Sequence, residues 1–459
     1  MSIDISSRFN YEQLFRFVLP SVVMMIFIST YTMVDGFFVS NYVGKTAFTA
    51  VNLIFPAIMV FACVGFMFGA GGSALVAKTM GEGQTEKANR LFSLIVLSAF
   101  AGGILLSALG YFLMPFFASA MGASGEVLAC SVFYGRTLLL SLPMFVLQRV
   151  FQSFMVTAGK PSLGLHMTIL FGVMNIGLDA LFILIFKWGL LGAGLATVLC
   201  EYAGGLFPLI YFLKRNTSSL QLVKPEWDGT ALWKVCTNGS SELLTNISMS
   251  FVSMLYNYQL ISIAGTDGVV AFGVIMYVAF FFEAIFIGYS MGTAPIVSYN
   301  YGARNPERVK AAFKMLLKAS LVYSTLLWAA VMLFPQGFAA MFTNKPELLT
   351  FTKTALRIYM ACLLLFGVQI ACQMTFTSLG YAKASILVAV MRKFVLLIPL
   401  IYILPLVFTA DKTTAVYLAE PAADFIAVSF TAVLFAFQFR KALRQISDGE
   451  ASDKKPATM

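Results

Sequence analysis

The chain has 459 residues, of which 59% are hydrophobic and only 11% are charged, and its formal net charge is +10. Soluble globular chains carry about 25% charged residues, so this composition excludes a soluble enzyme and a nucleic-acid-binding protein. Uncharged runs such as 46–77 and 91–125 are long enough to cross a bilayer core of about 30 Å. The composition therefore predicts an integral membrane protein.

Breaks at charge clusters and at Gly, Pro and Asn residues divide the chain into twelve predicted transmembrane helices. The first apolar run is too long for the core of a signal peptide and leads into further spans, so we expect it to be the first transmembrane helix. We expect an all-α integral membrane fold whose spans cover approximately 13–39, 47–77, 90–115, 130–157, 163–187, 190–213, 234–262, 268–298, 310–335, 352–378, 384–408 and 414–439.

The distribution of Lys and Arg predicts the orientation in the membrane. With the N-terminus inside, most cations fall in the loops of one side, and the positive-inside rule makes that side cytoplasmic. We therefore expect a multi-pass protein of a bacterial cytoplasmic (inner) membrane with both termini in the cytoplasm, whose basic loops face anionic lipid rather than nucleic acid. The opposite loops hold only Lys45, Lys187, Lys345, Lys353 and Lys412.

An internal repeat relates the two halves of the chain. A shift of 221 residues superimposes them without a gap over more than a hundred positions, and it places Gly302 on Gly81 and Arg357 on Arg136. Each half has six predicted spans, so both insert in the same orientation as parallel repeats. We expect a two-lobe organisation with an N-lobe at 1–214, a cytoplasmic linker at 215–233, a C-lobe at 234–440 and a cytoplasmic tail at 441–459.

Two such lobes leave a cleft between them, and rocking of one lobe against the other predicts a transporter that works by alternating access. No G-x-x-x-x-G-K-[ST] sequence occurs, so we expect no ATP-driven motor. The driving energy must then come from an ion gradient.

Acidic residues inside predicted spans mark candidate sites, because a charge near the bilayer centre costs at least about 2.5–3.5 kcal/mol. Asp35 in span 1 and Asp179 in span 5 lie at similar depths, and Asn175 shares a helix face with Asp179. Thr197 in span 6 reaches a comparable depth. These oxygen ligands suit a shared proton, or Na⁺ as a bound metal if the protein is Na⁺-coupled. The second half has Tyr256 and Leu400 at the positions equivalent to the two acids.

Other polar residues are candidates for substrate binding. Gln152 and Gln373 are repeat-related and either line the cleft or join helices. Glu283 is either a substrate contact or the partner of an arginine, and we expect Tyr256 to influence substrate range. Glu420 and Asp424 share one face of span 12, for which we favour a structural role. The single histidine, His166, has no nearby acidic or thiol ligands, so we expect no metal site there.

With these features the chain resembles the multidrug and toxic compound extrusion (MATE) family, in its DinF-like or MepA-like bacterial branch. The resemblance covers nearly the whole chain, and its most specific part is an Asp on span 1, Asn-x3-Asp on span 5 and a Thr on span 6. It implies efflux of cationic or amphipathic organic compounds in exchange for H⁺ or Na⁺. Where such proteins often have Asn on span 4, this chain has Gln152 followed by Ser153, so the choice of ion stays open.

The leading hypothesis is thus a cation-coupled multidrug exporter. The alternative is a lipid-linked precursor flippase of the same superfamily, which should have a more cationic cleft. A membrane-embedded enzyme is disfavoured, since no H-E-x-x-H sequence occurs. We expect no cofactor apart from the coupling ion, no catalytic residue, small organic cations and membrane lipid as partners, and a monomer.

Overall fold

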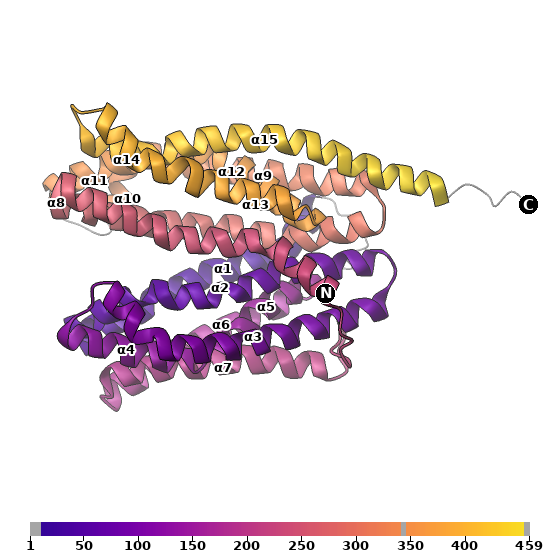
Figure 1. Ribbon diagram of the computed structural model, residues 1–459, viewed down its shortest axis with the longest axis horizontal. Helices are drawn as coiled ribbons and strands as arrows, with labels where there is room; N and C mark the ends of the chain where they lie inside the picture. Colours follow the sequence, from indigo (N-terminus) through magenta and orange to yellow (C-terminus); the bar gives the residue numbers. More distant parts are fainter. Residues whose placement is uncertain (1–10, 341–345, 454–459) are drawn as a thin grey trace, which may run out of the picture.

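The computed structural model describes residues 11–340 and 346–453, which are mostly helical and contain no strand. Figure 1 shows long, roughly aligned helices in two groups, with α1–α7 in the lower half and α9–α15 in the upper half. The first half contains α1 (Tyr11–Phe38), η1 (Val39–Val43), α2 (Lys45–Gly81), α3 (Thr85–Ala120), α4 (Gly125–Leu139), α5 (Leu142–Thr157), α6 (Pro161–Asp179), η2 (Ala180–Ile185) and α7 (Gly189–Leu213).

The second half begins with α8 (Gly229–Gly302), which consists of two helical segments joined at a kink at Gly265 and borders the other group of helices in Figure 1. Three short π-helical segments, η1, η2 and η3, interrupt the α-helices of the described chain. The remaining elements are α9 (Pro306–Leu333), α10 (Pro335–Ala340), α11 (Pro346–Tyr359), α12 (Leu363–Leu379), α13 (Ala382–Val390), η3 (Met391–Leu397), α14 (Ile398–Val407) and α15 (Lys412–Asp453).

The helices confirm the expected all-α membrane fold. In the described residues, 9 helices are long and apolar enough to cross a membrane, and the bent pairs α4–α5 (56°) and α11–α12 (44°) raise the number to 11. The remaining predicted span, 234–262, forms the first part of α8. It contains the polar residues Asn238, Glu242 and Thr245 and is not among those 11. Gly265, with φ 64° and ψ −152°, separates it from the apolar segment that follows.

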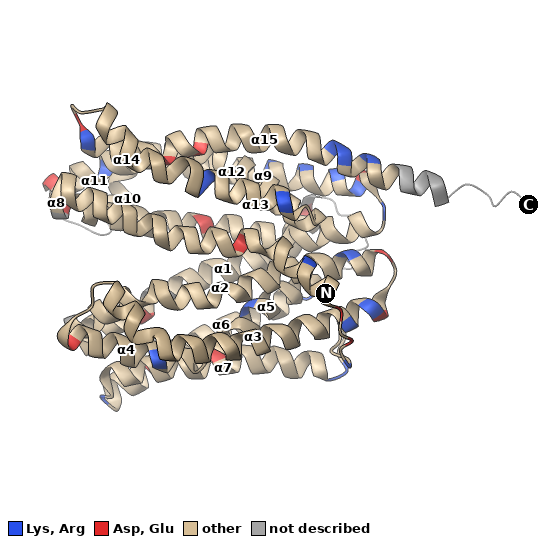
Figure 2. Ribbon diagram, in the orientation of Figure 1, with Lys and Arg blue, Asp and Glu red and all other residues tan. Residues whose placement is uncertain are grey.

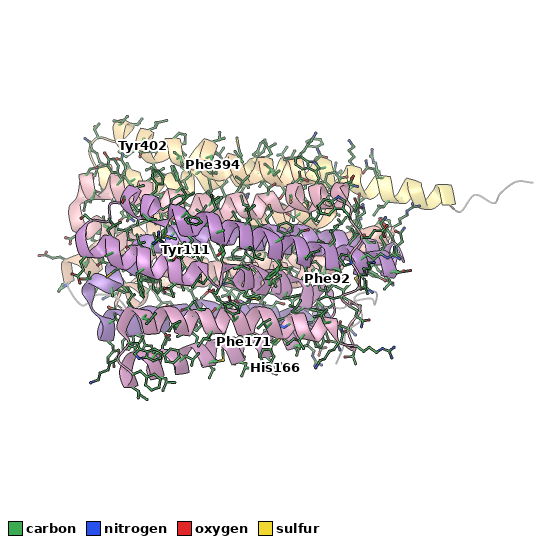
Figure 3. The ribbon with its side chains drawn as sticks, turned by 60° about the horizontal axis from the view of Figure 1, so that its bottom comes forward. Phe92, Tyr111, His166, Phe171, Phe394 and Tyr402 are labelled. Atoms are coloured by element: carbon green, nitrogen blue, oxygen red, sulfur yellow. The ribbon has the colours of Figure 1, made fainter. Side chains whose placement is uncertain are left out.

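Apolar side chains fill the interior and cover the outside. In the first half, the Phe92 ring packs against Phe151, Phe154 and Phe212, with centroid distances of 6.4, 4.6 and 5.0 Å. Figure 3 shows mainly carbon atoms on the outer surface between the two ends of the bundle. Such a surface suits lipid, because lipid offers no hydrogen-bond partner to polar groups.

The two halves make the same long-range hydrogen bond at repeat-related positions. Arg136 Nε donates to the Tyr111 carbonyl at 3.1 Å, and Arg357 Nε donates to the Met332 carbonyl at 3.1 Å. Both members of the second pair lie 221 residues after those of the first. The sequence repeat is therefore also a repeat in structure.

The halves meet through glycines at one end of α2 and α8. A Cβ atom on Gly81 would overlap the Tyr299 carbonyl oxygen, and one on Gly302 would overlap the Lys78 carbonyl oxygen. These four residues form two repeat-related pairs, so the contact has approximate two-fold symmetry. Figure 1 shows the two groups of helices meeting toward the end where α15 terminates and diverging toward the opposite end. Glycine is needed because backbone lies directly against backbone.

We expect Gly81→Ala and Gly302→Ala each to lower the thermal unfolding temperature by a similar amount. The added methyl group forces the two helices apart, and overpacking costs about 1–3 kcal/mol. Gly102→Ala in α3 is the matched control, because nothing lies within 4 Å of its added Cβ. It should keep or raise the unfolding temperature, since Ala is the better helix former. Equal effects of all three substitutions in detergent-solubilised protein would contradict this contact.

The segment between the halves is fixed to α3. Main-chain N–H groups of Gln221 and Val223 donate to Asn89 Oδ1 (3.0 Å) and Ser93 Oγ (2.8 Å). Arg90 Nη1 lies 2.6 Å from a carboxylate oxygen of Glu226. The segment is thus bound to the first half along most of its length.

Two predicted boundaries differ from the structure. The linker was expected over 215–233, but α8 already begins at Gly229, because the Asp228 side chain accepts a hydrogen bond from the Ala231 N–H and caps the helix. The tail was expected from 441, whereas α15 continues to Asp453. Ala442 and Ile446 are buried against the second half, so apolar packing extends this helix past the predicted span.

Candidate functional site

The structure brings Asp35 and Asp179 together. Asp35 lies near the end of α1, and Asp179 is the last residue of α6, directly before the π-helical segment η2. Their carboxyl groups interact electrostatically and lie within hydrogen-bonding reach of each other. Short π-helical segments occur often at functional sites, since they redirect side chains out of the regular helical pattern.

Three of the four oxygens of these carboxyl groups are buried without a hydrogen-bond donor in the part of the chain that the structure describes. Among the described residues, neither oxygen of Asp179 has a hydrogen-bond partner, and neither does Oδ1 of Asp35; the Asp179 side chain is 0% exposed. Two ionised carboxylates offer only acceptors. A proton held between them would supply the missing donor and remove one of two buried like charges.

Asn175 and Thr197 lie around this pair with other contacts of their own. Asn175 is buried one helical turn before Asp179, and its side chain lies near the Cys200 thiol. The Thr197 hydroxyl donates to the Ala193 carbonyl at 3.2 Å. The described residues contain no group of three or more His, Cys, Asp or Glu that could hold a metal ion. If both carboxyl groups were ionised, the pair would carry a buried double negative charge, so it needs a proton or another cation.

Two further residues in the described part of the chain lie near the pair, and the sequence did not assign either of them to it. The Tyr134 hydroxyl on α4 lies within electrostatic reach of Asp35, Asp179 and Glu201, and it contacts Thr197. No motif or spacing in the sequence pointed to Tyr134. Glu201 could have been found, since it follows Thr197 by four residues and so lies on the same face of α7.

The two predicted glutamines are nearly buried and hydrogen-bonded. Gln152 Oε1 accepts from Arg149 Nη1 at 3.1 Å within α5, and Gln373 Nε2 donates to Thr245 Oγ1 at 3.4 Å between α12 and α8. Their side chains thus contact neighbours in their own half. The role of either residue in substrate binding stays a prediction.

A second charged cluster lies in the other half, around η3. Arg392 Nε is 2.6 Å from Asp424 Oδ1, and Arg392 Nη2 is 3.4 Å from Glu420 Oε1. Lys393 Nζ is 2.9 Å from the same Glu420 oxygen. All four side chains are buried. The structural role favoured for Glu420 and Asp424 has a physical basis here, because each pairs with a cation that sequence reasoning did not assign to it.

Glu283 and Tyr256 border this cluster. Glu283 on α8 lies within electrostatic reach of Lys393 and Arg392. The Tyr256 ring stacks on Phe272, with centroids 4.8 Å apart, and its hydroxyl lies beside Glu420. With Glu283 ionised, three acids would face two cations, so the cluster could accept one further positive charge. Figure 2 shows acidic and basic residues on helices in the interior of both halves.

His166 plays no part in either cluster. Its Nδ1 lies 2.6 Å from the Ser162 carbonyl of the preceding turn of α6, and Figure 3 shows it near the edge of the bundle. An exposed imidazole bonded to its own helix has the geometry of a surface residue.

Two parallel repeats of membrane-spanning helices, with buried acids in both halves, define an integral membrane transporter. The chain belongs to the MatE family, whose model matches residues 20–181 and 243–403, one segment in each half. The resemblance inferred from the sequence is thereby confirmed.

Curated relatives include the multidrug export protein MepA of Staphylococcus aureus (strain NCTC 8325 / PS 47), 23% identical over 401 residues, which are 87% of this chain and 88% of the relative. MepA of Staphylococcus haemolyticus (strain JCSC1435) is 23% identical over 420 residues, 91% and 92% of the two chains.

Solved structures show the same fold. A MATE protein in complex with MaL6 matches with a TM-score of 0.89 and 22% identity, covering 95% of this chain and 98% of that one. A multidrug resistance MATE transporter of the MOP superfamily in an outward-facing conformation matches with a TM-score of 0.88 and 22% identity, with the same coverage.

Proposed function

We propose that this protein is a secondary active exporter that exchanges cationic or amphipathic organic compounds for protons by alternating access. The observation that carries the proposal is the pair of Asp35 and Asp179, in which Asp35 Oδ1 and both Asp179 carboxyl oxygens are buried without a hydrogen-bond partner among the described residues. A group that must gain and lose charge during transport cannot be neutralised by a permanent partner. The names of the MepA relatives, which describe multidrug export, support the substrate class.

The substrate cation would meet acidic side chains in either half. Asp35 and Asp179 provide negative charge in the first half, and Glu283 provides it in the second, where Tyr256 lies on the first segment of α8 and Gln373 on α12. Competition between a proton and an organic cation for the same carboxylates couples the two movements, since binding of one favours release of the other.

The same distribution of charge supports the orientation. Figure 2 shows Lys and Arg concentrated at the end of the bundle where α15 terminates. We propose that this end is cytoplasmic, with both termini inside, in the cytoplasmic membrane of a bacterium. The glycine contact between α2 and α8 then closes the cytoplasmic side. We also propose that the protein acts as a monomer in contact with lipid.

In reconstituted vesicles we expect an imposed pH gradient to drive accumulation of a monovalent cationic dye such as ethidium. Each pH unit supplies about 1.4 kcal/mol, which sustains roughly a tenfold dye gradient if one proton exchanges for one dye cation. The measurement is dye accumulation with a pH gradient or a Na⁺ gradient as the sole driving force.

The control is protein-free vesicles under the same gradients. Accumulation driven by Na⁺ alone would replace protons with Na⁺ as the coupling ion, with Asp35, Asn175, Asp179 and Thr197 as its ligands. Absence of dye movement under either gradient, together with translocation of a labelled polyprenyl pyrophosphate, would instead support the flippase alternative.

A further inference from the structure

Glu201 is an intramembrane acid outside the Asp35–Asp179 pair. It lies on α7, where its carboxylate oxygen Oε2 accepts a hydrogen bond from Ser141 Oγ at 2.6 Å. The ion pairs described for this chain do not include Glu201. Burying a carboxyl group inside a membrane span costs free energy, whereas an apolar side chain would pack there without that cost. The presence of Glu201 therefore suggests a function.

Ser141 has two acceptors for its single hydroxyl hydrogen. Its Oγ lies 2.6 Å from Glu201 Oε2 and 2.9 Å from the Leu138 carbonyl oxygen. When Glu201 is ionised, Ser141 can donate to it. When Glu201 is protonated, the carboxyl group can donate to Ser141 Oγ, and Ser141 can donate to Leu138 instead. The site therefore satisfies both protonation states without moving the backbone.

The fold fixes Ser141 at this position. Ser141 lies at the 56° bend between α4 and α5 and is 0% exposed. At this bend the Leu138 carbonyl accepts from the Ser141 main-chain N–H at 3.1 Å, and Ser141 Oγ lies 2.9 Å from the same oxygen. The bend thus places the Ser141 hydroxyl group against Glu201.

Glu201 is electrostatically connected to the aspartate pair. Tyr134 interacts with Asp35, Asp179 and Glu201, and the Cys200 thiol interacts with the same three acids. Glu201 follows Thr197 by one helical turn, so it lies about 6 Å further along α7 toward the linker. The acids therefore form a series that leads from the aspartate pair toward the proposed cytoplasmic end.

Positive charge also faces Glu201. Arg149 on α5 interacts electrostatically with Glu201 and with the Tyr31 hydroxyl on α1. Its guanidinium group lies 4.6 Å from the Phe145 ring centroid and donates to Gln152, while its Nε has no hydrogen-bond partner among the described residues. A deprotonated Glu201 would therefore not be an isolated buried charge. The titratable and charged groups around Glu201 are Tyr31, Asp35, Tyr134, Arg149, Asp179 and Cys200.

We infer that Glu201 is a third acid of the transport cycle, which carries protons between the Asp35–Asp179 pair and the cytoplasmic side. The proton leaves a carboxyl oxygen of the pair, binds a carboxylate oxygen of Glu201 and then passes to water at the cytoplasmic end. Ser141 and Arg149 are positioning residues that hold Glu201 in both states. This inference rests on the proposed proton-coupled function.

The test compares Glu201→Gln with wild-type protein in vesicles that contain a trapped pH indicator. Two rates are measured: proton movement driven by an ethidium gradient, and exchange of labelled for unlabelled ethidium at equal pH. In Glu201→Gln we expect the proton rate to fall about 100-fold while exchange stays within about twofold of wild type, because proton transfer by a positioned acid contributes about 10²–10⁴-fold.

Three further variants make the result specific. Glu201→Asp restores a carboxyl group and should recover much of the proton rate, whereas a purely structural role would not require an ionisable group. Ser141→Ala should shift the pH dependence of the proton rate, since it removes the donor to ionised Glu201. Glu307→Gln, an exposed acid in the first turn of α9, is the matched control and should leave both rates unchanged.

Wild-type proton movement in Glu201→Gln would overturn the role of Glu201 alone. Loss of exchange in both Glu201→Gln and Glu201→Asp would also overturn it, by showing that Glu201 only supports the fold. Absence of dye-driven proton movement in wild-type protein would reject the proposed proton coupling, and this inference with it.

Discussion

Asp35→Asn and Asp179→Asn are each expected to abolish proton-driven export and to leave the folded protein at least as stable as wild type. Asn keeps the shape of the side chain and cannot exchange a proton. Stability should not fall, because Asn replaces an acid whose buried oxygens have no hydrogen-bond donor among the described residues, so the cost of burying a charge there is removed. Dye accumulation under a pH gradient and the thermal unfolding temperature measure the two effects.

Asp267→Asn is the control for this prediction. Asp267 is exposed at the start of the second segment of α8, so its loss removes one carboxylate without touching either cluster. Export by this variant should match wild type. Full proton-driven accumulation by Asp35→Asn, or a large fall in its unfolding temperature, would show that the pair is structural and would remove the main support for the proposed function.

Arg392→Met is expected to have the opposite profile, with a loss of stability as its primary effect. Arg392 makes two contacts with Asp424, at 2.6 and 3.3 Å, and its guanidinium lies 4.7 Å from the Phe366 ring centroid. Removal of the cation leaves Asp424 buried without its partner, and breaking such a pair costs about 3–5 kcal/mol. We therefore expect a markedly lower unfolding temperature in detergent.

The double variant Arg392→Met with Asp424→Leu tests whether Arg392 and Asp424 interact directly. When both charges are removed together, no uncompensated acid remains, so the double variant should be more stable than Arg392→Met alone. Additive losses in the double-mutant cycle would contradict direct pairing. Equal stability of Arg392→Met and wild type would indicate that Asp424 is solvated or carries a proton.

These two predictions follow from one difference between the halves. In the first half, Asp35 and Asp179 face each other, and neither carboxyl oxygen of Asp179 has a hydrogen-bond donor among the described residues. In the second half, Glu420 and Asp424 face Arg392 and Lys393. A permanently paired acid stabilises a fold, whereas an unpaired buried acid must bind something from outside. The proposed coupling proton and the buried ion pairs would thus lie in different halves of a repeated architecture.

The amino-acid sequence by itself determined the membrane class, the approximate spans and the repeat. These features depend on local composition and on matches at one fixed shift, such as Arg136 with Arg357, which need no knowledge of packing. The sequence also indicated that Asp35 and Asp179 lie at similar depths, since helical rise converts position along a span into depth. The family followed from residues on spans 1, 5 and 6.

Only the tertiary structure decided which charged groups are paired. Arg392 and Asp424 are 32 residues apart, and Ser141 and Glu201 are 60 residues apart, so their contacts depend on how helices pack and rotate. The bend at Ser141 and the π-helical segments η2 and η3 also change the direction of side chains, which regular helical periodicity does not predict. Depth in the membrane can be read along one helix, whereas a partner across the bundle is fixed by the rotation of two helices about their axes.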